Sequence, residues 1–169
     1  MRRTWVALLL MLVWAIPAAA QDPATEPDED GCKDKGTEQQ VVADASAMEA
    51  EIHRTGSVAL YGINFDTGKA TLQAGSEKML GEIVKLMKDH TDWRFEVQGH
   101  TDSVGAKGTN LTLSEQRAKT VVEWLTKNGV AAARLVAKGY GDTVPLMDNA
   151  TDDGRAKNRR VELKKLNDE

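Results

Sequence analysis

Between residues 57 and 165, the spacing of the apolar residues alternates between the period of a β-strand and the period of an α-helix. Residues 57–65 are rich in β-forming side chains and carry no charge, as a buried strand does. Residues 72–88 place apolar side chains at helical spacing, with lysine and glutamate on the opposite face. Residues 93–99 alternate apolar and polar side chains, which predicts a strand with one buried face.

A second helix is predicted after a polar, glycine-containing loop that extends to residue 110. Thr112 and Glu115 have the spacing of a capping box, which predicts the start of this helix, and Asn110 is a rival start. The apolar stripe that follows stops at residues 128–129, where an Asn-Gly pair is typical of a helix end.

Two further strands are predicted over residues 134–139 and 159–165, joined by a loop that includes Pro145. The order of elements is then strand, helix, strand, helix, strand, strand. This order predicts an α/β (α+β) fold: a two-layer sandwich with a mixed four-stranded sheet and helices on one face.

The first twenty residues have the three parts of a secretory signal peptide. Two arginines precede an unbroken apolar run over residues 5–16, and residues 18–20 are alanines. The run is shorter than the ~20 apolar residues that a membrane-spanning helix needs, so we expect cleavage after residue 20 rather than an uncleaved anchor. The next residue is Gln21, whereas a lipoprotein signal would require a cysteine there.

Residues 21–40 carry many charges, prolines and glycines, and such a composition predicts a linker. A short, weakly amphipathic helix is predicted over residues 41–54, so we expect the folded domain to occupy residues 56–169. Cys32 is the single cysteine, which excludes an internal disulfide and leaves a free thiol or an intermolecular disulfide.

The net charge limits the classes of partner. The chain has 22 basic and 26 acidic residues, a formal net charge of −4. An acidic protein is a poor candidate for binding nucleic acid or an anionic membrane, so we expect neither as a partner.

Asp102 and Arg117 are charged residues on either side of the polar loop that joins the strand at residues 93–99 to the next predicted helix. Asp102 follows the strand at residues 93–99, and Arg117 lies at the edge of the apolar stripe of the next helix. A partly shielded guanidinium binds a carboxylate through two parallel hydrogen bonds, and an aspartate accepts from an ammonium. The pair therefore matches a zwitterion such as an amino-acid head group. An ion pair between Asp102 and Arg117 that ties the loop to the helix explains the pattern equally well.

Several motifs together resemble the OmpA-like peptidoglycan-binding domain family, which includes the C-terminal domain of outer membrane protein A and the peptidoglycan-associated lipoproteins. The resemblance covers about residues 56–165, with the motifs in the expected order. The motifs are YGINFDTGKATL at 61–72, GHTD at 99–102, Gly105, Asn110, LSEQRA at 113–118, GYG at 139–141 and GRAKNRRVEL at 154–163.

The resemblance implies non-covalent, non-enzymatic binding of the diaminopimelate residue in the peptidoglycan stem peptide, without a cofactor. In the family, the aspartate of GHTD and the arginine of LSxxRA hold the ammonium and the carboxylate of that residue, and they fall on Asp102 and Arg117 here. The resemblance implies that Asn110, Asp66 and Phe65 complete the pocket. Binding to the cell wall would tether or position the protein in the envelope. The signal peptide predicts export to the periplasm, and the sequence leaves open whether the protein is held at the outer membrane.

His100 and the arginines near the C-terminus invite other interpretations. The chain contains only three histidines and no zinc-binding motif, so we expect His100 to organise the turn after its strand and predict no metal site. Arg155, Arg159 and Arg160 are expected on a solvated strand face, with one of them supporting the sheet edge or the ligand pocket.

Two other functions remain open. A peptidoglycan hydrolase would need a nucleophile, a metal or paired carboxylates. Cys32 lies in the linker and no GxSxG motif is present, while Asp66 and Asp102 leave a carboxylate pair possible. An envelope scaffold would dock a protein partner through residues 21–55.

Overall fold

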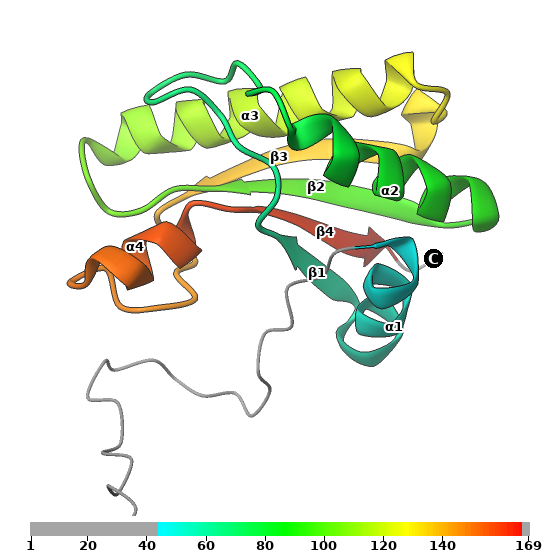
Figure 1. Ribbon diagram of the computed structural model, residues 1–169. Helices are drawn as coiled ribbons and strands as arrows, with labels where there is room; N and C mark the ends of the chain where they lie inside the picture. The colour runs from blue at the N-terminus through cyan, green and yellow to red at the C-terminus, as the bar shows by residue number, and fades with distance from the viewer. Residues whose placement is uncertain (1–43, 167–169) are drawn as a thin grey trace, which may run out of the picture.

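The computed structural model of the protein describes residues 44–166, which form a four-stranded sheet with helices packed against it (Figure 1). The elements in chain order are α1 (Ala45–Thr55), β1 (Ser57–Leu60), α2 (Ser76–Asp89), β2 (Arg94–His100), α3 (Lys107–Lys127), the 3-10 helix η1 (Ala132–Arg134), β3 (Leu135–Gly141), α4 (Asp152–Asn158) and β4 (Val161–Leu166). The signal peptide, the linker and Cys32 lie outside the described residues.

The sheet has the strand order β1-β4-β2-β3. β4 is antiparallel to both β1 and β2, and β2 is parallel to β3. The sheet is therefore mixed, as predicted. Because β1, β2 and β3 run in the same direction, their carboxyl ends meet at one edge, where β4 begins. The loops that leave this edge, and α4, lie together at that end of the molecule (Figure 1).

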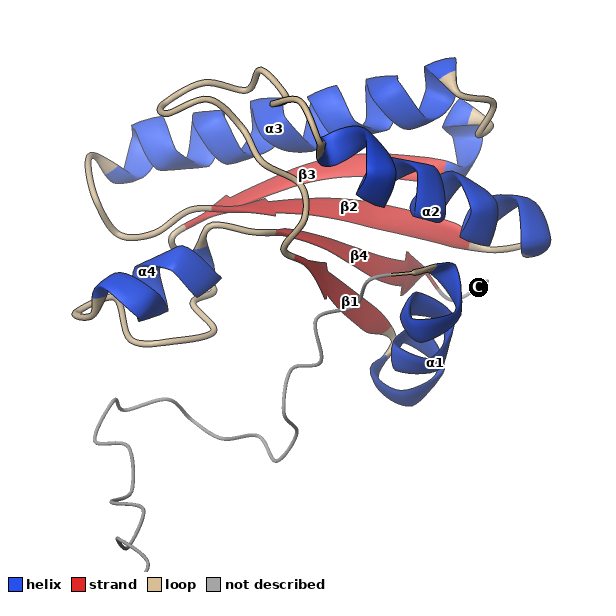
Figure 2. Cartoon of the chain, in the orientation of Figure 1, coloured by secondary structure: helices blue, strands red, loops and turns tan. Residues whose placement is uncertain are grey.

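The hydrophobic core lies between the sheet and the helices α2 and α3, which cover one face (Figure 2). The inward side chains of the central strands, such as Phe95, Val97 and Leu163, are fully buried. They meet the apolar faces of the helices, which include Ile83 and Val121. The predicted two-layer sandwich is confirmed.

The first strand is shorter than predicted. β1 ends at Leu60 because its partner β4 begins at Val161, the residue opposite Leu60. The chain then turns, and Phe65 forms only an isolated bridge with Leu72. The helix predicted over residues 72–88 consequently begins later than expected, because α2 starts at Ser76 and Leu72 lies outside it.

The helix that follows β2 begins earlier than predicted. Gly105, with a φ of 99°, turns the chain, and α3 starts at Lys107 with an extended Ala106 before it. Thr112 and Asn110 both lie inside the helix, so the predicted capping box is wrong. The predicted end is confirmed, because α3 stops at Lys127.

Two helices, α1 and α4, differ from what the sequence predicts. α1, predicted as a weak helix ahead of the domain, buries Met48 and Ile52 in the core, so the packed part of the chain begins before residue 56. α4 occupies a segment that was predicted as a loop. Its first turn is capped by Thr151, whose hydroxyl oxygen accepts from the amide of Gly154 at 3.0 Å. Among the described residues, no helix combines the length and hydropathy required to cross a membrane.

Candidate ligand-binding site

Two adjoining clefts lie at the edge where the carboxyl ends of the three parallel strands meet. The main cleft has a volume of about 760 Å³ and is formed by the β2–α3 loop, the first turns of α3, residues 67–68 and two arginines near α4. The side cleft has a volume of about 390 Å³ and is formed by residues 61–65 and the end of α4. Arg117 and Arg159 line both clefts and so join them.

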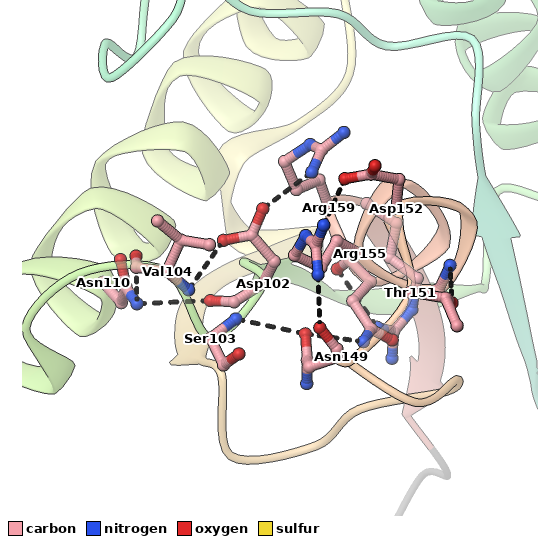
Figure 3. Close-up of polar contacts among 12 residues, drawn as sticks. Asp102, Ser103, Val104, Asn110, Asn149, Thr151, Asp152, Arg155 and Arg159 are labelled. Atoms are coloured by element: carbon pink, nitrogen blue, oxygen red, sulfur yellow. Dashed lines mark hydrogen bonds and ion pairs between the residues drawn. The ribbon is translucent and has the colours of Figure 1, made fainter. Parts of the chain in front are cut away.

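Asp102 lies in the main cleft with its carboxylate already oriented (Figure 3). Its Oδ2 accepts from Nη1 of Arg159 at 2.7 Å, and its Oδ1 accepts from the backbone amide of Val104 at 3.0 Å. The Asp102 side chain is only 13% exposed. The ion pair that the sequence suggested between Asp102 and Arg117 is thus formed with Arg159 instead.

Arg117 reaches the same cleft from α3 and is half-buried. Its Nε donates to the carbonyl oxygen of Lys69 at 3.0 Å, and its guanidinium lies 5.0 Å from the centre of the Phe65 ring. Burial lowers the pKa of the Arg117 guanidinium below its usual value; Asp102 opposes this shift and Arg159 adds to it. Within residues 44–166, its two Nη groups have no hydrogen-bond partner, so the forked end of the side chain is free to bind a carboxylate.

Asn110 is buried and fixes the shape of the loop. Its side-chain amide donates to the carbonyl oxygens of Asp102 and Val104, each at 3.2 Å (Figure 3). Because both contacts are to backbone oxygens, Asn110 holds Asp102 in place from inside α3.

Phe65 and Asp66 occupy different positions. Phe65 lines the side cleft beneath the guanidinium of Arg117. Asp66 lines neither cleft; its carboxylate is 3.5 Å from the side-chain nitrogen of Gln73, and its backbone bonds to Lys69 and Thr71. The structure therefore brings four of the five predicted site residues to the clefts and leaves Asp66 in the adjoining turn.

Close packing of α3 on the sheet sets the position of Arg117. A Cβ added at Gly99 would lie 2.1 Å from the carbonyl oxygen of Ser114, and one added at Gly139 would lie 2.4 Å from the amide nitrogen of Glu115. The hydroxyl of Ser114 accepts from the amide of Gly141 at 2.9 Å. The glycines of the GHTD and GYG motifs thus allow the helix to approach the strands directly.

Arg155 and Arg159 were expected on a strand face, with one of the three arginines supporting the sheet edge or the pocket; instead Arg155 lies in α4, Arg159 follows it directly, and both line the main cleft. Arg155 donates to the carbonyl oxygens of Asn149 and Ala150, at 2.7 and 3.0 Å, and pairs with Asp152 (Figure 3). Arg159 lies four residues later and orients Asp102. Their separation of four residues, which is the spacing of neighbours on one face of a helix, is the signal that could have placed them together.

Arg160 and His100 are buried on the face of the sheet that points away from α2 and α3. Arg160 is 4% exposed and bonds to Glu162 and to the carbonyl oxygen of Val144, so the predicted solvated strand face is wrong for this residue. His100 stacks on Tyr140, and burial, followed by the charge of Arg160, lowers the pKa of His100 to about 3. No group of three potential metal ligands is present in residues 44–166.

Comparisons with known proteins agree with this architecture. Residues 64–159 match the family model described as the OmpA family. Outer membrane porin F of Pseudomonas fluorescens is 42% identical over 100 residues, covering 59% of this chain and 31% of that protein. The peptidoglycan-binding protein ArfA of Mycobacterium tuberculosis is 40% identical over 101 residues, covering 60% and 31%. The chain thus spans about a third of the length of these curated relatives.

Solved structures share the fold. The peptidoglycan-associated lipoprotein from Burkholderia pseudomallei matches with a TM-score of 0.57 and 26% identity, covering 67% of this chain and 92% of that one. A putative MotB-like protein from Desulfovibrio vulgaris matches with a TM-score of 0.60 and 27% identity, covering 67% and 74%. None of these four proteins is named as an enzyme.

Proposed function

Because this chain belongs to the OmpA family, we propose that it binds peptidoglycan, and that it does so through the diaminopimelate residue of the stem peptide. The observation that carries the proposal is the pair of opposite charges in the main cleft: the oriented carboxylate of Asp102 and the free guanidinium fork of Arg117. The free end of diaminopimelate carries one ammonium and one carboxylate on the same carbon. An ammonium at Asp102 and a carboxylate at Arg117 would satisfy both.

The balance of charge in the main cleft supports an anionic ligand with one ammonium. Its lining contains one acid, Asp102, and three guanidinium groups, those of Arg117, Arg155 and Arg159. Arg155 is engaged with backbone carbonyls and Asp152, and Arg159 neutralises Asp102. The positive charge of Arg117 is left for the ligand. A stem peptide has more carboxylates than ammonium groups, which suits this balance.

The remaining site residues hold these two charges at a fixed separation. Asn110 ties the loop that carries Asp102 to α3, and the ring of Phe65 lies against the Arg117 guanidinium. Asp66 acts indirectly in this proposal, since its backbone closes the turn that presents the Lys69 carbonyl to Arg117. A preformed site loses little entropy when the ligand binds.

Wall binding would tether or position the protein in the cell envelope. One relative is named as a peptidoglycan-binding protein and another as an outer membrane porin, and these names support the proposal. The proposal includes export by residues 1–20, a periplasmic location and an association with the outer membrane.

No observation favours the hydrolase. Asp102 is engaged by Arg159, and Asp66 lies outside both clefts, so the two acids do not flank a common substrate position. The scaffold interpretation concerns residues 21–55, and α1 at the end of that segment buries part of its apolar face against the domain. A partner would therefore bind mainly through residues ahead of α1.

Sedimentation with purified, diaminopimelate-containing sacculi tests the proposal. The unmodified protein is expected to pellet with the sacculi, and the Asp102→Ala and Arg117→Ala variants to remain in solution with unchanged circular dichroism. Soluble muropeptides, measured in the same supernatants, are expected to stay at the level of sacculi alone. Pelleting of both variants would refute the site, and muropeptide release would identify a hydrolase.

A further inference from the structure

We propose that the side cleft is a second subsite, which binds the free carboxylate of the glutamate residue that precedes diaminopimelate in the stem peptide. This inference rests on the proposed function, because it assigns diaminopimelate to the main cleft. It makes Lys157 a residue that determines specificity for the carboxylate over its amide.

The first observation is the charge of the side cleft. Three basic residues line it, Arg117, Lys157 and Arg159, and no acidic residue does. Its other lining residues are neutral: Tyr61, Ile63, Asn64, Phe65 and Ala156. A concave site of this composition attracts an anionic group and repels an ammonium.

The second observation is that one cation of the side cleft, Lys157, is available for a second anionic group. Lys157 is exposed and has no ion-pair or hydrogen-bond partner within residues 44–166. Arg159 contacts Asp102 through Nη1 alone, and the Arg159 side chain is 49% exposed. A bound carboxylate would therefore displace no existing partner of Lys157. Asp102 does not compete for Lys157, because its own carboxylate is already bound by Arg159.

The third observation is the continuity of the two clefts. Arg117 and Arg159 line both, so the two clefts adjoin and a ligand group in one lies next to a group in the other. The volume of about 390 Å³ is sufficient for one amino-acid residue. Aromatic side chains, Tyr61 and Phe65, offer walls for its methylene groups. The adjoining residue of the same peptide is the group best placed to occupy it.

The chemistry of the stem peptide identifies this group. The D-glutamate that precedes diaminopimelate is linked through its side-chain carboxyl, so its α-carboxyl is not part of the chain. This group exists either as a free carboxylate or as an amide. Only the carboxylate gains from a cationic cleft, and we therefore expect the protein to distinguish the two forms of the wall.

Calorimetric titration with two synthetic peptides tests the inference. One is L-Ala-γ-D-Glu-diaminopimelate, and the other differs only in carrying D-isoglutamine. The unmodified protein is expected to bind the acid about threefold to tenfold more tightly than the amide, the gain of a partly exposed ion pair among several cations. Lys157→Gln is expected to remove most of this preference and to leave binding of the amide unchanged. Lys127→Gln, an exposed lysine at the end of α3, is the matched control and is expected to keep the preference.

The outcomes separate failure of the subsite from failure of the proposed function. Equal affinity of the unmodified protein for acid and amide, or a preference that survives Lys157→Gln, overturns the subsite while diaminopimelate binding stands. If neither peptide binds, the proposed function itself fails. A tetrapeptide with a further D-alanine locates the carboxylate: if this extension, rather than amidation of glutamate, abolishes the effect of Lys157→Gln, the anion comes from the C-terminal side and the assignment to glutamate is wrong.

Discussion

Replacing Asp102 by asparagine tests the role of its charge with little change in shape. The substitution keeps an oxygen that accepts from the amide of Val104, at 3.0 Å from Oδ1 in the native protein. It removes the ion pair with Arg159, whose side chain is 49% exposed. Partly exposed ion pairs contribute about 1 kcal/mol or less, so we expect the free energy of unfolding to fall by no more than that amount.

Ligand binding is expected to suffer more. In the complex, the ammonium of diaminopimelate would be shielded between the cleft and Asp102, and a charged, shielded pair that loses one partner costs about 2 to 3 kcal/mol. This corresponds to a loss of about 30- to 150-fold in affinity. The predicted effect on binding is thus at least twice the predicted effect on stability.

Two measurements on the same samples check this prediction: calorimetric titration with the diaminopimelate tripeptide, and urea unfolding followed by circular dichroism. Asp92→Asn is the matched control, since it makes the same change of charge at an exposed position just before the start of β2, at the end of the strand away from Asp102. Affinity of Asp102→Asn within threefold of the unmodified protein, at any stability, would refute the reasoning. Equal losses in binding and stability would show that Asp102 acts only by holding its loop.

Three further predictions concern the framework of the site. Gly139→Ala places a Cβ 2.4 Å from the backbone of Glu115, so it is expected to lower the free energy of unfolding by about 1 to 3 kcal/mol in urea titrations, whereas Gly81→Ala, with open space around it in α2, is expected to raise it by about 0.5 to 1 kcal/mol. Arg134 donates to the carbonyl oxygens of Met87, His90 and Trp93, so Arg134→Ala is expected to cost about 2 kcal/mol of stability while the folded variant still pellets with sacculi. Burial, with Arg160, lowers the pKa of His100 to about 3. The stability that its neutral ring contributes is therefore present above pH ~6.5 and is lost as the pH falls toward 3, by up to about 1.4 kcal/mol per pH unit. Unfolding midpoints measured at successive pH values should depend less on pH in His100→Phe than in the unmodified protein.

The order of elements was predictable because the buried faces of the strands and long helices impose clear periods on the sequence. Phe95 and Val97 alternate with polar residues in β2, and the apolar stripe of α3 ends where Asn128 follows it. The boundaries were less predictable, since they depend on partners distant in the chain. β1 ends at Leu60 because its partner β4 begins opposite that residue, and the sequence near Leu60 contains no local signal that predicts this end.

For a related reason, the sequence did not predict the helix α4 or the packing of α1 on the core. α4 has seven residues and no apolar stripe, and its position is fixed by tertiary contacts. Asn158, for example, accepts from the backbone amides of Leu146 and Met147, at 2.8 and 3.0 Å. In α1, Met48 and Ile52 are the two large apolar residues, a pattern too sparse to predict docking on the core.

The placement of Asp102 and Arg117 in one cleft follows in part from chain order, because a strand's carboxyl end lies beside the amino-terminal half of the helix that follows it, and α3 carries Arg117 near its middle. The partner of Asp102 did not follow from it. Arg159 reaches Asp102 from a segment 57 residues away, and the free fork of Arg117 depends on the Lys69 carbonyl, which sequence alone does not position.

A comparison of two ligands tests most directly whether the main cleft recognises both charges of one amino acid. The diaminopimelate tripeptide and its lysine analogue differ by the single carboxylate assigned to Arg117. By calorimetry, the unmodified protein is expected to bind the lysine peptide at least about 30-fold more weakly, and Arg117→Ala to bind both peptides with equal, low affinity. Equal affinities of the unmodified protein for the two peptides, or a preference that persists in Arg117→Ala, would contradict the account.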